Sequence, residues 1–488
     1  MRYSMLVTIT DMSRTLLEAA QYLASAPAGD IRAELLDNGR RMMGQIRDVL
    51  ERHSGDLRTT LPLERLWKIG QLWGGGEHGA LEETLEEFIR KLPEEVSYQV
   101  RAVFFAELGE KWDAMESVYE YMRNDPRFDP VVVRTPVGRV VMRDGKKEQE
   151  IIYKDFLTPM GIPSLGYDQY SLEEDCPELA FISQPYESCT LREFWPETIA
   201  KVTRLVYLPY WMPDLISEDT RETLCQLPVY QYAWKVIGSS GSHYRYYTKH
   251  ALNGGGNMLV TGIPKTDPTI CLLKKGTNIP DNWKTVIEGR KVILWNTWYS
   301  FEDSSLKYFD EIRDWFHHHN DCALIWRPHP MTETVAKLYY PKEIYDRIHN
   351  CMAEVERSNN MLLDTGASYM AAFWCSAAQI SDFSSLMFQY LLLDKPVLWI
   401  SRSNDEMRKE NRNFFVDWHW MEEAVNADGI LEFLERTRTG CDKKRDLRDK
   451  IRRRDIPLAD GFCGERVCEE LWKCLHTEDA VAILKAEG

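Results

Sequence analysis

The stretch VRAVFFAELGEKWDAMESVYEYMRNDPRFDPVVV, residues 100–133, decides the fold class. Its first seven residues form a short apolar run typical of a buried strand. Apolar residues then recur at helical spacing over Trp112–Met122, and residues 131–133 begin a second strand. A strand, a helix and a strand in this order form a βαβ unit, which implies a parallel sheet. The stretch therefore predicts an α/β protein.

The same alternation continues along the chain and divides it into parts. Further strands are expected at residues 179–183, 205–207 and 258–261, and then at 292–295, 323–326, 361–363, 379–381 and 396–400. We expect a helical accessory domain at 1–97, an N-terminal α/β lobe on the acceptor side at 98–271, a linker at 272–290, a C-terminal α/β lobe on the nucleotide-donor side at 291–475 and a tail at 476–488. Two such lobes facing a cleft are a usual way to hold an activated donor opposite an acceptor.

Composition narrows the class of function. The net charge of −16 argues against nucleic acid as a partner, so an anionic ligand needs a local positive site. Eleven cysteines occur without a CxxC pair, no signal peptide is recognisable, and no apolar run approaches the roughly 20 residues of a membrane span. We therefore expect a cytoplasmic protein with reduced thiols. The basic stretch at 436–454 is interpreted as a solvated helix face, with peripheral contact to the inner face of the cell membrane as the alternative.

The strongest candidate site follows the strand at 379–381. Asp382, Ser384 and Ser385 lie where this strand ends and a helix begins, so hydroxyls and free backbone amides meet a helix N-terminus. Such a site suits a phosphate or pyrophosphate. Plain N-capping by Ser384 is the alternative, and Asp382 would contact a ribose hydroxyl, orient a neighbour or stabilise the cap.

A second candidate is the segment WRPHP at 326–330, directly after a strand. Its prolines stiffen the loop, Arg327 is suited to fork onto a phosphate, and His329 is suited to act as general acid or as a donor to a phosphate oxygen. The alternative is a rigid turn with a hydrogen-bonded histidine.

Candidates in the first lobe are weaker. Gly262 permits a close backbone approach and Lys265 brings a cation near the cleft, but a simple Gly-Pro turn explains the segment equally well. The stretch at 239–250 contains His243 and His250 and would face an anionic substrate or form a solvated loop. No metal site is predicted, because the three consecutive histidines at 317–319 point in different directions on a helix and no Asp-x-Asp motif follows a strand at a plausible position. No cofactor is predicted either.

These segments together resemble the CDP-glycerol glycerophosphotransferase family, the teichoic-acid and capsule polymerases of GT-B fold. The resemblance runs from about residue 102 to residue 471. Its markers are the opening strand and helix with Trp112, DPVVV at 129–133, QPY at 184–186, VYLPY at 206–210, TGIPKTD at 261–267, ILWNTW at 293–298, RPHP at 327–330, SDFSS at 381–385 and DGFCGERV at 460–467. It implies two Rossmann-type lobes with parallel sheets facing a cleft.

The resemblance also implies a reaction. A CDP-activated polyol donor such as CDP-glycerol would bind mainly to the second lobe, with His329 facing its phosphates and with Asn296 and Thr297 in the substrate site. A hydroxyl of a cell-envelope glycan or lipid-linked acceptor would attack the phosphorus next to glycerol, and CMP would leave.

The chain departs from the family in one respect. It lacks the His-Gly-Thr-Pro segment whose histidine is taken as the acceptor's general base, and the corresponding region reads LPVYQYAW at 227–234. His243 is the substitute that we expect, with His250 as the alternative. A GT-B glycosyltransferase that uses a nucleotide sugar, and a non-catalytic nucleotide-binding or scaffold protein whose N-terminal helices bind a partner, remain the competing hypotheses.

Overall fold

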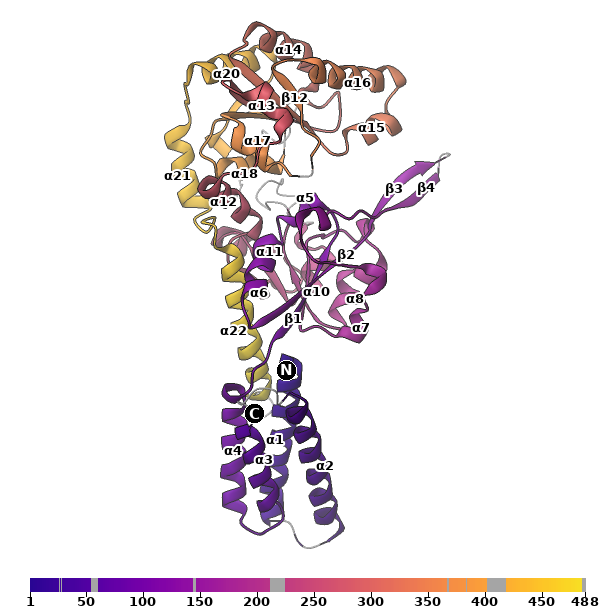
Figure 1. Ribbon diagram of the computed structural model, residues 1–488, viewed down its shortest axis with the longest axis vertical. Helices are drawn as coiled ribbons and strands as arrows, with labels where there is room; N and C mark the ends of the chain where they lie inside the picture. The colour runs from indigo at the N-terminus through magenta and orange to yellow at the C-terminus, as the bar shows by residue number, and fades with distance from the viewer. Residues whose placement is uncertain are drawn as a thin grey trace.

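The computed structural model describes residues 1–25, 27, 29–53, 60–143, 146–210, 224–366, 368–382, 384–401 and 418–484 of the 488-residue chain. Figure 1 shows three parts along one long axis: a helical bundle at the bottom, a first α/β lobe in the middle and a second α/β lobe at the top. Each lobe has its own parallel sheet. The predicted α/β class, with two lobes and an N-terminal helical region, is confirmed.

The bundle consists of α1 (Tyr3–Ser25), α2 (Asp30–Arg52), α3 (Thr60–Leu72) and α4 (His78–Glu95). Apolar residues spaced three or four apart give each helix one buried face, and these faces share a core. Gly39 allows α2 to approach the end of α3 closely, because a Cβ atom at this position would lie 2.1 Å from the Trp73 ring.

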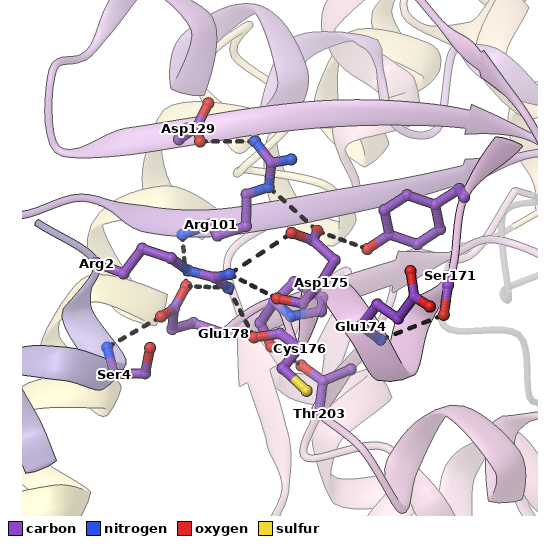
Figure 2. A network of polar contacts seen from close by, with 12 residues as sticks. Arg2, Ser4, Arg101, Asp129, Ser171, Glu174, Asp175, Cys176, Glu178 and Thr203 are labelled. Carbon is purple, nitrogen blue, oxygen red and sulfur yellow. Dashed lines mark hydrogen bonds and ion pairs between the residues drawn. The ribbon is translucent and has the colours of Figure 1, made fainter.

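The bundle is attached to the first lobe through the start of α1, as Figure 2 shows. The buried carboxylate of Glu178 accepts hydrogen bonds from the backbone N–H groups of Ser4 at 3.0 Å and Arg101 at 2.7 Å. The guanidinium of Arg2 donates to the same carboxylate at 3.3 Å and to the carbonyl oxygen of Asp175 at 2.5 Å. Hydrogen bonds to a charged group are among the stronger ones, so this contact fixes the bundle to the lobe.

The first lobe is built on a seven-stranded parallel sheet with the strand order β5-β2-β1-β6-β7-β8-β9. Its strands are β1 (Val100–Ala106), β2 (Phe128–Arg134), β5 (Leu165–Gly166), β6 (Leu179–Ile182), β7 (Arg204–Tyr207), β8 (Lys235–Gly238) and β9 (Met258–Val260). Its helices are α5 (Gly109–Trp112), α6 (Glu116–Asn124), α7 (Leu172–Asp175), α8 (Pro196–Ala200), α10 (Pro228–Tyr232) and α11 (Gly241–His250). The following helix, α12 (Asp267–Lys275), contributes Leu272 to the core of the second lobe. The single helix expected at 112–122 is thus broken, with residues 113–115 turning between α5 and α6.

An antiparallel ribbon of β3 (Val137–Arg143) and β4 (Lys146–Ile152) projects from the first lobe (Figure 1). Central β1 is buried on both faces, since Phe104 stacks on Phe181 of β6 at 4.4 Å between ring centroids while Val103 and Phe105 face a second core. Burial on both faces explains the continuous apolar run from which the strand was predicted.

The second lobe has a six-stranded parallel sheet with the strand order β12-β11-β10-β13-β14-β15. Its strands are β10 (Lys291–Thr297), β11 (Cys322–Pro328), β12 (Met361–Leu363), β13 (Ala378–Ser381), β14 (Val397–Ile400) and β15 (Glu422–Ala424). Its helices are α13 (Asp281–Ile287), α14 (Phe309–His318), α15 (Thr332–Tyr339), α16 (Lys342–Arg357), α17 (Met370–Cys375), α18 (Ser385–Leu391), α20 (Ala427–Thr439) and α21 (Arg445–Asp455). All five strands predicted for this lobe are present.

The segment expected as a linker, residues 272–290, is instead packed structure. It contains the end of α12 and all of α13, and Leu272 and Trp283 belong to the core of the second lobe. Its Gly and Pro residues mark the ends of these helices, which the sequence pattern did not separate from a free connection.

The last helix, α22 (Cys463–Leu484), crosses back to the first lobe, although residues up to 475 were expected in the second. It runs along the first lobe to the bundle (Figure 1), where Tyr98 contacts His476 at 2.8 Å. Residues 485–488 of the predicted tail lie outside the described residues. Val467 and Leu471 complete the core under β1, which explains their apolar character at helical spacing.

The structure also bears on the basic stretch, on membrane spans and on the cysteines. The basic stretch is not solvated throughout, because Arg448 is buried and pairs with Asp394 at 3.1 Å and Asp442 at 2.5 Å. Among the described residues, no helix is long and apolar enough to cross a membrane. All eleven cysteines are free thiols.

Candidate functional site

The carboxyl-terminal edges of the two sheets face each other. Asp113, which follows β1 and α5, accepts a hydrogen bond from the phenol of Tyr369, which follows β12 in the other lobe. Lys265, which follows β9, pairs with the same Asp113 oxygen at 2.5 Å. Residues after strands of both sheets therefore meet, and the ligand crevice of a parallel sheet lies at this edge. The predicted site residues lie at or after strands β8 and β9 of the first sheet and β10, β11 and β13 of the second.

His329 stands at the tip of β11. Its Nδ1 accepts a hydrogen bond from the backbone N–H of Met331 at 3.1 Å, so in the neutral ring the proton is on Nε2. Burial lowers the pKa of His329 to about 4, which keeps the ring neutral at physiological pH. The ring can therefore donate one hydrogen bond from Nε2, and no residue in the described part of the chain occupies this donor. The predicted role of His329 toward phosphate is compatible with this geometry and stays a prediction.

Two aromatic side chains from the loop after β10 flank His329. The ring centroids of Trp298 and Tyr299 each lie 5.3 Å from the imidazole centroid. Asp382, at the tip of β13, orders this loop: its carboxylate accepts hydrogen bonds from the backbone N–H groups of Trp298 at 2.6 Å and Ser305 at 2.8 Å. Asp382 thus positions Trp298, which agrees with the expectation that it orients a neighbour, and its contact with a ribose stays untested.

Arg327 is buried and engaged within its own lobe. Its guanidinium donates to the carboxylate of Asp364 at 2.6 Å and to the carbonyl oxygen of Gly366 at 2.6 Å, and it lies over the ring of Tyr369 at 6.0 Å. These contacts clamp the loop after β12 to the tip of β11. The structure therefore shows that Arg327 positions this loop, and its predicted contact with phosphate stays a prediction.

Asn296 and Thr297, at the end of β10, are also buried. The side chain of Asn296 accepts a hydrogen bond from Gln379 at 2.8 Å, and Thr297 accepts one from the indole N–H of Trp326 at 3.1 Å. Both side chains thus join neighbouring strands, and their assignment to the substrate site stays a prediction.

Ser384 and Ser385 lie at the start of α18, next to the tip of β13. Ser384 is the N-cap, since its hydroxyl accepts a hydrogen bond from the backbone N–H of Leu386 at 3.2 Å. Both serines are partly exposed. Because β11, β10 and β13 are adjacent, these serines, Trp298 and His329 belong to three neighbouring strand tips of one edge. Phosphate binding by the two serines stays a prediction.

The first-lobe segment at 261–267, which we call the hinge segment, packs against the start of α22, where the chain returns to the first lobe, and its contact with a ligand stays a prediction. Gly262 has a φ of +81°, and a Cβ atom there would lie 2.7 Å from Sγ of Cys463. Asp267 caps α22 by accepting hydrogen bonds from the backbone N–H groups of Cys463 at 3.1 Å and Gly464 at 2.8 Å. Lys265 pairs with Asp113, and its predicted contact with substrate stays a prediction.

His243 lies on α11 and is 3% exposed. Its Nδ1 accepts a hydrogen bond from the backbone N–H of Ser239 at 3.2 Å, which closes the turn between β8 and α11. Burial lowers the pKa of His243 to about 4. The burial of His243 and its hydrogen bond to Ser239 are consistent with a structural role. Its predicted role as the acceptor's general base is not supported by this geometry.

A pocket of about 860 Å³ lies away from these strand tips, between α6, α12 and the start of α22. Its lining includes Glu116, Glu120, Asp125 and Glu465 together with Lys275. Burial, followed by the charges of Asp113 and Glu120, raises the pKa of Glu116. Carboxylates at this density repel a diphosphate, so the size of the pocket does not make it the donor site.

Three residues that join the lobes were not predicted from the sequence: Asp113, Tyr369 and Gln389, whose Nε2 donates to the phenol of Tyr369 at 2.5 Å. Their partners lie far along the chain or in the other lobe, so no local pattern indicates them. Glu107, directly after β1, was also missed, although the rule that led to His329 applies equally to this position.

Comparison with known proteins agrees with this architecture. A family model described as CDP-Glycerol:Poly(glycerophosphate) glycerophosphotransferase matches residues 217–473, just over half of the chain. A search of curated protein sequences finds no match.

Three solved structures resemble the chain in fold. The putative UDP-N-acetylglucosamine 2-epimerase from Listeria monocytogenes is 13% identical with a TM-score of 0.52, and the alignment covers 78% of this chain and 97% of that one. The S. aureus MnaA–UDP co-structure is 13% identical with a TM-score of 0.50 and the same coverage. A histidine-to-asparagine variant of the wall teichoic acid polymerase TagF is 11% identical with a TM-score of 0.50, covering 86% of this chain and 98% of that one. At these identities the likeness shows a GT-B-like fold alone.

The matched range contains the two motifs that the structure brings to adjacent strand tips, RPHP after β11 and SDFSS after β13. It also contains the hinge segment and the start of α22 that packs against it. Because the match spans more than half of the chain, the protein is a member of the CDP-glycerol:poly(glycerophosphate) glycerophosphotransferase family.

Proposed function

We propose that the protein transfers glycerol phosphate, or a related polyol phosphate, from a CDP-activated donor to a hydroxyl of a cell-envelope glycan or its precursor and releases CMP. The observation that carries this proposal is the neutral His329 ring at the tip of β11, with its Nε2 proton unengaged by the described residues beside the adjacent tips of β10 and β13. Such a donor fits a phosphate oxygen. TagF, the wall teichoic acid polymerase of similar fold, supports the choice of acceptor class.

In this reaction the residues of the second lobe would position the donor and stabilise charge. The Nε2–H of His329 would bind a phosphate oxygen, and the partly exposed hydroxyl of Ser385 with the first amides of α18 would bind the diphosphate from the neighbouring tip. Arg327 would act indirectly, because its guanidinium holds the loop after β12. Charge that develops on the leaving CMP would then meet fixed donors, which is how such sites accelerate transfer.

Donor binding tests the proposal first. CDP-glycerol or CDP-ribitol should raise the Tm, by an amount that corresponds to about 2.7 kcal/mol at a donor concentration about 100-fold above Kd. Stabilisation by UDP-sugars alone would favour a nucleotide-sugar transferase. Release of CMP with a polyol acceptor would distinguish an enzyme from a non-catalytic binding protein.

Variants test the assigned residues. His329→Ala and a Ser384→Ala/Ser385→Ala double variant should lose most of the donor-induced Tm shift while staying folded. Asn426→Ala is the matched control, since Asn426 caps α20 through Gly429 at 3.0 Å and its loss costs a helix cap, about 1 kcal/mol, away from the strand tips. Donor-induced Tm shifts equal to that of the wild type in both site variants would refute the assignment of these residues to the donor site.

A further inference from the structure

A cluster of polar side chains occupies the strand tips of the first lobe, where no site residue was expected. Glu107 follows β1, Gln184 follows β6 and Tyr210 follows β7, which are three adjacent strands. Glu107 is 8% exposed, and its Oε2 is contacted by Nζ of Lys111 at 2.9 Å and by Nε2 of Gln184 at 3.4 Å. Nζ of Lys111 also lies 4.8 Å from the ring centroid of Tyr210. We refer to Glu107, Lys111, Gln184 and Tyr210 as the tip cluster.

The tip cluster has unused hydrogen-bond acceptors. Oε1 of Gln184, in a side chain that is 6% exposed, is buried and has no partner among the described residues. The contacts of Glu107 both use Oε2, so its Oε1 accepts nothing from this part of the chain. Leaving a buried acceptor unpaired is unfavourable, so a hydrogen-bond donor that reaches Oε1 of Gln184 gains stabilisation. Spare acceptors on two side chains that contact each other suit a ligand that donates hydrogen bonds, and hydroxyl groups are such donors.

The tip cluster faces the second lobe. Lys111 is two residues before Asp113, which binds Tyr369 of that lobe. The ring of Tyr369 packs under Arg327, two residues before His329. Glu107 is thus linked to the tip of β11 through Lys111, Asp113, Tyr369 and Arg327, partly by contacts and partly by steps of two residues along the chain. A hydroxyl bound at the tip cluster would therefore approach from the first lobe, across the contact between Asp113 and Tyr369 from the proposed donor site.

We propose that Glu107 is the general base that takes the proton of the acceptor hydroxyl, with Gln184 accepting a hydrogen bond from a neighbouring hydroxyl of the same polyol end. This inference rests on the proposed function. The acceptor oxygen forms a bond to the phosphorus next to the glycerol unit, the bond from that phosphorus to the CMP oxygen breaks with its electron pair going to CMP, and the proton moves to Oε1 of Glu107. The carboxylate of Glu107 would thus serve as the acceptor's general base, the role of the histidine in the His-Gly-Thr-Pro segment that this chain lacks.

The ionisation of Glu107 agrees with this role. Burial raises its pKa, and the charge and hydrogen bond of Lys111 and the amide of Gln184 act in the opposite direction. The titratable groups that face it are Lys111 and Tyr210, and burial raises the pKa of the Tyr210 phenol, which stays neutral. A carboxylate with a raised pKa is a better base near neutral pH than an exposed one. Turnover should therefore rise with pH as Glu107 loses its proton.

Glu107→Gln tests the inference, because it keeps the shape and removes the base. The matched control is Glu116→Gln. Glu116 also has a raised pKa, but it lines the separate pocket between α6, α12 and α22. With CDP-glycerol and a soluble oligo(glycerol phosphate) as acceptor probe, Glu107→Gln should lower kcat by roughly 10²- to 10⁴-fold and flatten the acid limb of the pH profile. Its donor-induced Tm shift should equal that of the wild type, which also shows that it is folded. Glu116→Gln should retain kcat within about threefold.

Further outcomes separate this inference from the proposed function. Wild-type kcat and pH profile in Glu107→Gln would overturn the inference alone. If Glu107→Gln is unfolded, Glu107→Asp serves instead: the base is kept but withdrawn by one methylene, so a normal kcat would again overturn the inference. Donor binding by the wild type without CMP release in the presence of the acceptor probe would instead refute the proposed transfer reaction, and the inference with it. Failure of both CDP-glycerol and CDP-ribitol to stabilise the wild type would likewise refute the proposed function.

Discussion

The hydroxyl of Tyr369 offers a direct test of how the lobes are held together. It donates to the carboxylate of Asp113 in the other lobe and accepts from Gln389 at 2.5 Å. Tyr369→Phe removes this hydroxyl alone, because the ring beneath Arg327 and Lys265 remains. The substitution therefore isolates the polar contact across the interface.

The magnitude follows from what each partner retains. A hydrogen bond to a charged group contributes about 1.5–3 kcal/mol, and of the two bonds of the Tyr369 hydroxyl only that to Asp113 crosses the interface. The bond from Gln389 to this hydroxyl lies within the second lobe, so its loss does not change the free energy of opening. Asp113 keeps its pair with Lys265 at 2.5 Å, and Gln389 keeps the carbonyl oxygen of Lys265 at 3.3 Å, which places the expected loss near the lower end. We expect the free energy of opening the interface to fall by about 2 kcal/mol, equivalent to about 30-fold in the opening equilibrium.

Amide hydrogen exchange measures this opening directly. Peptides covering residues 109–116 and 368–375 should exchange about 30-fold faster in Tyr369→Phe, while the sheets keep their protection. The matched control is Tyr390→Phe, which removes a buried phenol that contacts the hydroxyl of Ser376 at 2.9 Å within the second lobe. Unchanged exchange at 109–116 in Tyr369→Phe, or equal acceleration there in Tyr390→Phe, would refute the reasoning.

Two further predictions concern the hinge and pH. Gly262→Ala should lower the Tm more than Gly254→Ala. Both glycines have a positive φ, at which alanine costs about 1 kcal/mol or more, but only at position 262 would the new Cβ atom clash with Cys463 and Leu458. Equal losses of Tm in the two variants would contradict this packing. Burial lowers the pKa of His243 from the ordinary 6.5 to about 4 in the folded protein. Between pH 6.5 and pH 4 the unfolded chain therefore binds a proton that the folded protein does not bind, so stability should fall as the pH falls through this range. His243→Asn should remove roughly 3 kcal/mol of that pH dependence, and a Tm series with an unchanged acid slope would contradict this.

The sheets could be predicted from the sequence where their strands are buried on both faces. β1, β10, β11 and β14 are continuous apolar runs, as expected for central parallel strands. β8 was not predicted because its sequence, Lys-Val-Ile-Gly, has only two apolar residues between a lysine and a glycine, and β15 reads Glu-Glu-Ala. The strands β3 and β4 alternate with many charges and have no such run.

The candidate site was predictable in position but not in detail. Strand ends placed His329 and Ser384 at one edge, because every parallel strand delivers its following loop to the same side. Sequence could not show that Arg327 and Lys265 are already paired, since Asp364 and Asp113 come to them only through tertiary folding. Whether a cation in such a motif already pairs with a carboxylate is decided by tertiary folding, which the local pattern does not show.

The return of α22 has a consequence for how the protein is made. The core of the first lobe includes Val467, Leu471 and Leu475, so this lobe cannot complete its packing until nearly all of the chain has left the ribosome. The second lobe draws its core from residues 263–456 and has no such dependence. Synthesis in order of sequence should therefore finish the later lobe first, and a stop codon before residue 463 should damage the earlier one.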